Sequence, residues 1–184
     1  MPIVTKRRRI ILKKKIISIE DIISHLSATV TRLQSFNPSL KIIFTISPVR
    51  HVRDGVVENN RSKARLIEAI HFVKEKYEKV FYFPAYELII DVLRDYRFYK
   101  TDLVHPTDAA TGFVFENFCN AYVDEPGKKL LEEIKNIVSA MNHKPFQKES
   151  EAYKKFMSVQ LAKIKMIAER FPAIDFTNEK KYFS

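Results

Sequence analysis

Ile42-Ile43-Phe44-Thr45-Ile46 is an uninterrupted run of apolar and β-branched residues, and it is closed by Pro48. A second run, Val80-Phe81-Tyr82-Phe83, is closed by Pro84. Continuous runs of this kind, without alternating polar residues, are typical of strands buried on both faces of a parallel sheet. We therefore predict two parallel strands, at 41–47 and 80–83, with both faces of the first strand covered.

The segment between the two runs has a helical pattern. Its apolar residues recur at helical spacing from Leu66 to Tyr77, and Asn59 or Asn60 is expected to cap the helix. A strand, a helix and a strand of this length form one βαβ unit. This unit places the chain in the α/β class.

Helices are also predicted on both sides of this unit. Ser18 followed by Asp21 matches a capping box, and the helix it starts should end before Pro38. Thr107 can cap a second helix. Further helices are expected at 85–93, 126–141 and 149–171, and 94–106 is expected to be a long loop. Two strands alone leave sheet edges open, so another part of the protein, the basic amino terminus, a second copy or a partner chain should cover them.

The net charge of +10 is concentrated at the amino terminus. Seven lysines and arginines between Lys6 and Lys15, against Glu20, give the first twenty residues +6, and the other 164 residues carry +4. A basic terminal run on a nearly balanced body is typical of a solvated segment. Nucleic-acid binding is therefore not the expected function, and phosphate binding through this segment is the alternative.

Several other classes of protein are disfavoured. No apolar run reaches the roughly 18 residues of a membrane span, and Ile10-Ile11-Leu12 is too short for a signal-peptide core. The single Cys119 permits no intrachain disulfide, so we expect a cytoplasmic protein. The five histidines lack metal-ligand spacing, and no P-loop or Rossmann glycine pattern occurs, so we expect no metal and no cofactor.

Asp102-Leu103-Val104-His105-Pro106 is the stretch that most suggests catalysis. A histidine that acts as a general base needs a carboxylate to fix its tautomer and to stabilise the imidazolium. We predict that Asp102 accepts a hydrogen bond from the His105 Nδ1–H, which leaves Nε2 facing the open side of the sheet. A purely structural contact between the two side chains is the alternative.

Two other stretches are candidates for substrate binding. Ser47, Arg50 and His51 follow the carboxyl end of the first strand, where open α/β sheets bind ligands. Arg97 lies in 94–99, a mixture of cations and aromatic rings that can bind an acyl or anionic group. The alternatives are that Arg50 and His51 satisfy loop carbonyls and carboxylates, and that 94–99 forms an internal ion pair.

A longer pattern contains all of these stretches, and it resembles the GSCFA proteins, a family similar to the SGNH (GDSL-like) acyl hydrolases. The resemblance extends over 18–184. It is carried by IFTISPVRH at 43–51, ENNRSKA at 58–64, YFPAYE at 82–87, LRDYRFY at 93–99, DLVHP at 102–106, NHKPF at 142–146 and ESEAY at 149–153.

The resemblance implies an SGNH-like three-layer fold with a serine nucleophile in a Gly-Ser-Cys-Phe-Ala block, His105 as the general base and Asp102 as its orienting partner. This sequence contains no such block. We therefore expect an incomplete SGNH-like domain at 18–122, between a basic segment at 1–17 and a helical extension at 123–184, in a truncated form of the family fold.

The resemblance implies a hydrolase of acyl or carbohydrate esters, and without the nucleophile block we expect the chain to be inactive alone. One alternative is a non-catalytic interaction module that needs a partner chain or a second copy. The other is a weak nucleic-acid binder that uses the basic segment. Turnover of a simple ester separates the first two, and salt-dependent duplex binding that is lost on deleting residues 1–15 identifies the third.

Overall fold

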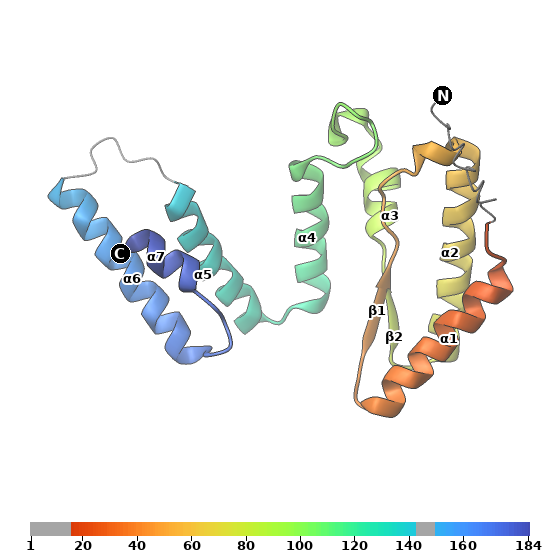
Figure 1. Cartoon of the computed structure of the whole chain (residues 1–184), viewed down its shortest axis with the longest axis horizontal. Helices are drawn as coiled ribbons and strands as arrows, with labels where there is room; N and C mark the ends of the chain where they lie inside the picture. The colour runs from red at the N-terminus through yellow and green to blue at the C-terminus, as the bar shows by residue number, and fades with distance from the viewer. Residues whose placement is uncertain (1–15, 143–149) are drawn as a thin grey trace, which may run out of the picture. The chain divides into compact units, whose positions relative to one another are not determined.

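A computed structural model of the 184-residue chain describes residues 16–142 and 150–184. The chain divides into two compact units, Met1–Phe118 and Cys119–Ser184 (Figure 1). The cationic run from Lys6 to Lys15 lies outside the described residues, and so does most of the stretch at 142–146.

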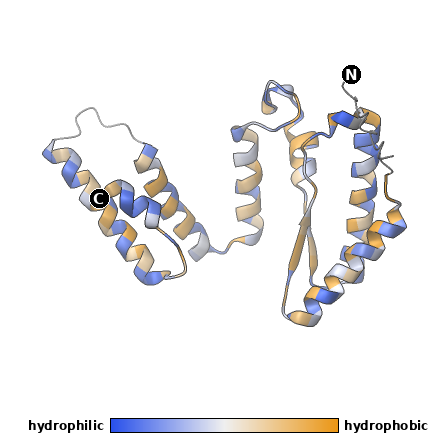
Figure 2. Ribbon diagram, in the orientation of Figure 1, coloured by the Kyte–Doolittle hydropathy of each residue, from blue (hydrophilic) through white to orange (hydrophobic). Residues whose placement is uncertain are grey.

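The first unit is built on a two-stranded parallel sheet. β1 (Ile42–Thr45) pairs with β2 (Val80–Phe83), with Ile42 opposite Val80 and Thr45 opposite Phe83, and α2 (Val56–Lys76) connects the two strands. Both strands are strongly apolar along their length (Figure 2). The predicted α/β fold with parallel strands and a helical C-terminus is confirmed.

α1 (Ile19–Phe36) and α2 cover one face of the sheet. The core on this side is formed by Val30 of α1, Val73 of α2 and Val80 of β2. Ser18 caps α1 as predicted, since its Oγ accepts from the Asp21 N–H at 3.1 Å. The helix ends immediately before Asn37-Pro38, also as predicted.

The start of α2 corrects one prediction, because neither Asn59 nor Asn60 caps the helix. Gly55 occupies the N-cap position with a φ of 85°, a left-handed conformation that favours glycine, and the helix begins at Val56. Asn59 is already helical and only 8% exposed, and its Oδ1 accepts from the His51 N–H at 2.8 Å. The amide therefore anchors the loop that follows β1.

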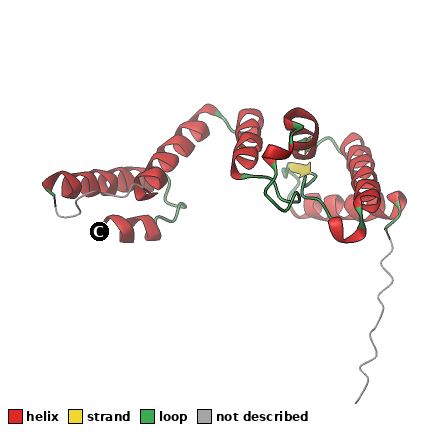
Figure 3. Ribbon diagram, turned by 90° about the horizontal axis from the view of Figure 1, so that it is seen from above, coloured by secondary structure: helices red, strands yellow, loops and turns green. Residues whose placement is uncertain are grey.

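Helical segments also lie on the other side of the sheet (Figure 3). α3 (Ala85–Glu87) runs into the π-helical segment η2 (Leu88–Leu93), the 3₁₀ turn η3 (Tyr96–Phe98) follows, and α4 (Asp108–Tyr122) comes after the loop. As predicted, Thr107 caps α4, with its Oγ1 accepting from the Ala110 N–H at 3.4 Å. These segments place the loop before α4 at the end of the unit where both strands finish (Figure 1).

The second face of β1 does not follow the prediction. Ile43 is 38% exposed and Thr45 is exposed, so only one face of this strand is closely packed among the described residues. The reason is that these two side chains line an open apolar groove against α4.

The second unit is helical, and its core is formed by three helices. α5 (Glu125–Asn142) and α6 (Glu151–Arg170) match the predicted helices, whereas the short α7 (Thr177–Phe183) was not predicted. Their common core consists of Ile137, Ile164, Ile167, Phe176 and Phe183. Across the described parts of both units, none of the helices combines the length and apolarity that a bilayer crossing requires.

Candidate functional site

The site begins with a closed loop between η3 and α4. The Lys100 N–H donates to the His105 carbonyl, and the Thr107 N–H donates to the Phe98 carbonyl, each at 2.8 Å. These bonds hold the two ends of the loop together. Within the loop, Leu103 has a φ of 55°, an unusual left-handed conformation for a residue other than glycine. The tight turn that results brings Asp102 back toward the backbone that follows it.

Asp102 and His105 form a directly hydrogen-bonded pair in this loop. The distance from the Asp102 Oδ2 to the His105 Nδ1 is 2.7 Å. The other carboxylate oxygen, Oδ1, accepts from the Val104 N–H at 2.9 Å and from the His105 N–H at 3.0 Å. An ionised carboxylate can only accept, so the proton of this contact belongs to Nδ1 of the ring. The predicted contact is confirmed, and the catalytic role of the pair remains a prediction.

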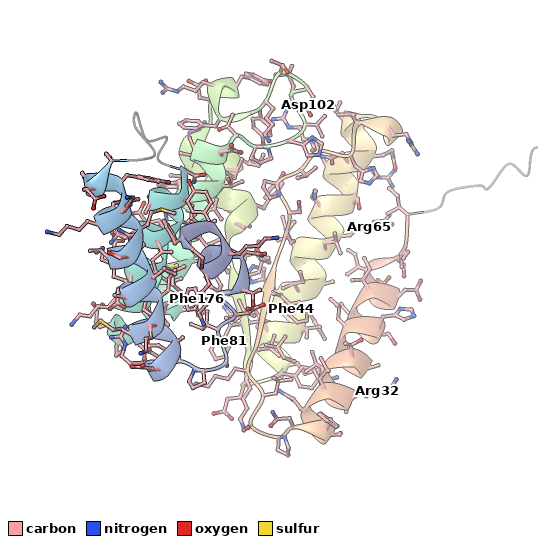
Figure 4. The ribbon with its side chains drawn as sticks, turned by 60° about the vertical axis from the view of Figure 1, so that its left-hand side comes forward. Arg32, Phe44, Arg65, Phe81, Asp102 and Phe176 are labelled. Atoms are coloured by element: carbon pink, nitrogen blue, oxygen red, sulfur yellow. The ribbon has the colours of Figure 1, made fainter. Side chains whose placement is uncertain are left out.

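The same contacts stabilise the charged form of Asp102. The backbone N–H of His105, then its ring, then the N–H of Val104 hold the pKa of the Asp102 carboxyl well below its ordinary value of 3.8. The side chains of His105 and Asp102 are 57% and 47% exposed, respectively. The ionised carboxylate therefore orients a ring that remains open to solvent. Figure 4 shows Asp102 at the end of the first unit where both strands finish.

Arg50 is brought to this loop from the carboxyl end of β1. Its backbone N–H donates to the Val104 carbonyl at 3.3 Å, which joins the loop after β1 to the loop that carries His105. Its guanidinium carbon lies 4.7 Å from the ring centroid of Tyr99 and 5.7 Å from that of Tyr96. The structure thus brings Arg50 next to the Asp102–His105 loop.

Ser47 and Arg97 are engaged locally. The Oγ of Ser47 accepts from the Val49 N–H at 3.2 Å, and its carbonyl accepts from the Lys63 Nζ at 2.6 Å. The Arg97 Nε lies 3.2 Å from the Asp95 Oδ2, which is the ion pair considered as the structural alternative. Binding of substrate by either residue is untested.

His51 lies beside a different pocket from Arg50. Its backbone N–H is bound by Asn59, and the residue lines a pocket with Glu58, Lys63 and Arg65 of α2. Arg65 in turn donates to the Ile17 carbonyl at 2.6 Å. Binding of substrate by His51 is likewise untested.

An apolar groove of about 440 Å³ runs between the uncovered face of the sheet and α4. The residue after His105, Pro106, forms part of its wall. The other lining residues are almost all apolar: Ile43, Thr45, Pro48, Phe83, Ala85, Ile89, Thr111, Val114, Phe115 and Phe118. Its volume falls within the range of about 300–1,000 Å³ that is typical of ligand pockets.

Two smaller pockets flank Arg50. One, of about 260 Å³, is lined by Asn60 and Tyr86, and the other, of about 130 Å³, by Arg94 and Tyr99. The sequence marked 94–99 as a mixture of cations and aromatic rings, but it did not single out Arg94, Tyr99 or Tyr86. Only their meeting with Arg50, which follows β1 whereas they follow β2, distinguishes them from ordinary loop residues.

Metal ligands are not gathered anywhere in the described part of the chain, where no group of three or more His, Cys, Asp or Glu side chains could hold an ion. The groups that do meet at this end of the unit are the His105 imidazole oriented by Asp102, the Arg50 guanidinium and an adjoining apolar groove.

Together, the fold and the site define an α/β protein with an Asp–His pair beyond the carboxyl end of a parallel sheet. The chain belongs to the GSCFA family, whose model matches residues 6–118. A second model, the C-terminal domain of the GSCFA domain protein, matches residues 134–184. No curated protein and no solved structure matches the chain.

Proposed function

We propose that the chain carries the general-base half of an ester-hydrolase site, in which His105 removes the proton of a nucleophile and Asp102 orients its ring. The observation that supports this most directly is the 2.7 Å contact between the Asp102 Oδ2 and the His105 Nδ1. When Nδ1–H donates to a carboxylate, Nε2 is the nitrogen that can accept the proton of a hydroxyl nucleophile.

The adjoining groove supports an acyl ester as the substrate class. It is apolar, it opens beside Pro106, and its volume of about 440 Å³ suits a short acyl chain. In this proposal the acyl chain occupies the groove and the ester carbonyl lies toward His105. Arg50 lies next to the same loop and is proposed to contact the polar part of the substrate. Ser47, His51 and Arg97 remain weaker candidates for substrate binding.

The nucleophile is the missing component. The family resemblance implies a serine in a Gly-Ser-Cys-Phe-Ala block, and the 184 residues contain no such block. Removing the nucleophile of a triad lowers turnover by a factor on the order of 10⁶. We therefore expect the chain alone to hydrolyse a short activated ester no faster than free imidazole at the same concentration.

The test has two arms. In the first, the purified chain is compared with His105→Ala, and multiple turnover that depends on His105 would contradict the proposed loss of activity. In the second, the Gly-Ser-Cys-Phe-Ala segment of a complete family member is fused to the amino terminus, and ester hydrolysis should appear. It should be lost in His105→Ala and fall by a factor on the order of 10⁴ in Asp102→Asn.

His25→Ala is the matched control. His25 is an exposed histidine of α1 whose Nδ1 contacts the Asp21 carbonyl at 2.6 Å, so it resembles His105 in exposure and in having a local contact. Its replacement should leave the fused protein fully active. A soluble, folded fusion that hydrolyses no ester would refute the assignment of His105 as the base.

A non-catalytic interaction module is the second candidate function. The uncovered face of β1 and the apolar groove favour it, since exposed apolar surfaces of this kind commonly mark contact sites. This reading predicts an inactive fusion protein and a partner chain that covers Ile43 and Phe115.

A further inference from the structure

The smaller of the two pockets beside Arg50 is lined by two arginine residues. Arg50 and Arg94 line it together with Asp95, Tyr96 and Tyr99, around a volume of about 130 Å³. Among the residues that the structure describes, neither Arg50 nor Arg94 has an ion-pair partner. The pocket therefore gathers positive charge that still lacks a counter-charge.

The one acidic residue in the lining does not supply that counter-charge. The Asp95 Oδ2 lies 3.2 Å from the Arg97 Nε, and its Oδ1 accepts from the Arg97 N–H at 2.9 Å. Both carboxylate oxygens are thus engaged by Arg97, a residue outside the pocket lining.

Arg50 is held in a way that leaves its donors available. Its guanidinium carbon lies over the ring of Tyr99 at 4.7 Å and near that of Tyr96 at 5.7 Å, and the residue is half-buried. A cation this close to an aromatic face is attracted to the ring, and none of the described residues accepts a hydrogen bond from the Arg50 side chain. The aromatic rings therefore fix the position of the fork without consuming its hydrogen bonds.

Tyr99 supplies an independent sign of a missing ligand. The residue is only 8% exposed, and within the described parts of the chain its buried hydroxyl has no hydrogen-bond partner. Buried polar groups are nearly always paired, so an orphaned hydroxyl in a pocket lining calls for an explanation. A bound group with acceptor oxygens provides one.

Arg94 reaches the pocket because of its backbone conformation. Its φ of 47° is left-handed, which is a common conformation for the residue that ends a helix. The conformation ends η2 and carries Arg94 into the pocket lining.

We propose that this pocket binds a small oxyanion group, such as the phosphate, sulfate or carboxylate of a small molecule. Arg50 and Arg94 donate charge-assisted hydrogen bonds to it, and the Tyr99 hydroxyl, which is closed to solvent in the unliganded chain, donates a third as the group enters. Guanidinium groups are the preferred partners of such oxyanions because their fork matches two acceptor oxygens at once. The proposal rests on the proposed function only in extending the role of Arg50. It is tested by binding without turnover, so a failure of ester hydrolysis would not contradict it.

The test is a titration of the full chain with inorganic phosphate, and separately with sulfate and acetate, at constant ionic strength. Two-dimensional NMR should show saturable shifts in the resonances of Arg50, Arg94 and Tyr99. Binding of phosphate and sulfate without acetate assigns a tetrahedral dianion, and the opposite preference assigns a carboxylate. If no anion produces saturable shifts at these residues, the proposal is wrong.

Variants separate this site from general electrostatics. Arg94 is exposed, so Arg94→Met should leave the fold intact and weaken binding by about tenfold or more. Arg32→Met is the charge-matched control, because Arg32 is exposed on α1 at the opposite end of the unit from Asp102 (Figure 4). Equal weakening in both variants would assign the binding to net charge and overturn the proposal.

Tyr99→Phe separates a role of the Tyr99 hydroxyl in anion binding from a role in folding. Removing an unpaired buried hydroxyl should leave the Tm of the unliganded chain unchanged or raise it, while the affinity for the anion falls. A Tm that drops together with unchanged affinity would show that the hydroxyl serves folding alone.

Discussion

Phe183→Ala removes the largest fully buried side chain of the described structure, which is 1% exposed. The ring lies in the core of the second unit with Ile137, Ile164 and Ile167, and it meets the ring of Phe156 at a centroid distance of 6.3 Å. Phe183 is also the last residue of α7. Its loss should therefore detach α7 from α5 and α6.

The expected cost is large compared with the stability of a unit of this size. Burial of about 150–200 Å² at about 25 cal/mol/Å² corresponds to about 4–5 kcal/mol, in line with measured Phe-to-Ala losses of about 3–5 kcal/mol. A unit that runs from Cys119 to Ser184 is expected to have a total stability of about 3–10 kcal/mol. The substitution should thus leave the second unit unfolded or close to unfolding.

Hydrogen exchange read out by mass spectrometry tests this unit by unit. Peptides from α5, α6 and α7 should lose protection in Phe183→Ala, whereas peptides from β1, β2 and α2 should keep it, because the two units have separate cores. The control is Phe36→Ala, the same substitution at a site that is 90% exposed, which should change stability by no more than about 0.5 kcal/mol. Full protection of α7 in Phe183→Ala would refute the reasoning.

Three further results are expected. Asp102→Asn should be less stable than the wild type at neutral pH, because contacts that lower the folded pKa of the Asp102 carboxyl stabilise only its charged form. The difference should shrink as the pH falls below about 3.8, where the carboxyl of the unfolded chain takes up a proton; urea unfolding between pH 2 and 7 measures this. Tyr82→Phe should lower the free energy of unfolding by about 1–2 kcal/mol, since the Tyr82 hydroxyl donates to the Glu87 carboxylate at 2.8 Å. An unchanged urea midpoint would contradict this. The chain should self-associate at micromolar concentration through its apolar groove, and Phe115→Glu should restore a monomer in light scattering; a wild-type monomer would contradict this.

Features determined by residues close in sequence could be predicted from the sequence. The cap at Ser18 and the cap at Thr107 depend on contacts across three residues. The Asp102–His105 contact is equally local, since the turn at Leu103 and two backbone N–H groups orient the carboxylate. In each case the residue type and the spacing almost fully determine which groups can meet.

Features that depend on competition between partners could not be predicted. Asn59 is a good capping residue, but the His51 N–H, which lies in the preceding loop, takes its side-chain oxygen instead. The short α7 shows little helical periodicity, and its N-cap residue, Phe176, makes no side-chain cap. Asp175, which precedes Phe176, accepts from the Thr177 N–H at 2.9 Å. An aspartate two residues before a threonine was the available sign, and it is too common to be decisive.

Contacts between distant parts of the chain were the least predictable. Arg50 and Tyr99 are far apart in sequence, and they meet because the βαβ unit brings the loop after β1 to the loop before α4. The continuous apolar run at 42–46 correctly indicated a parallel strand. It did not reveal that Ile43 would face an open groove. Apolar side chains indicate that a strand face favours burial, but they do not indicate whether another element packs against that face.

The local origin of the Asp102–His105 pair has a consequence for its chemistry. Among the described residues, the hydrogen bonds that the Asp102 carboxylate accepts all come from residues 104 and 105, so the pair keeps its geometry whether or not a nucleophile is present. A general base is effective only when its free nitrogen meets the reacting proton in a site shielded from water. The His105 side chain is 57% exposed. In the proposed site, activity would therefore depend on a nucleophile that reaches Nε2 and on a cover that excludes water from it, and the Asp102–His105 pair by itself supplies neither.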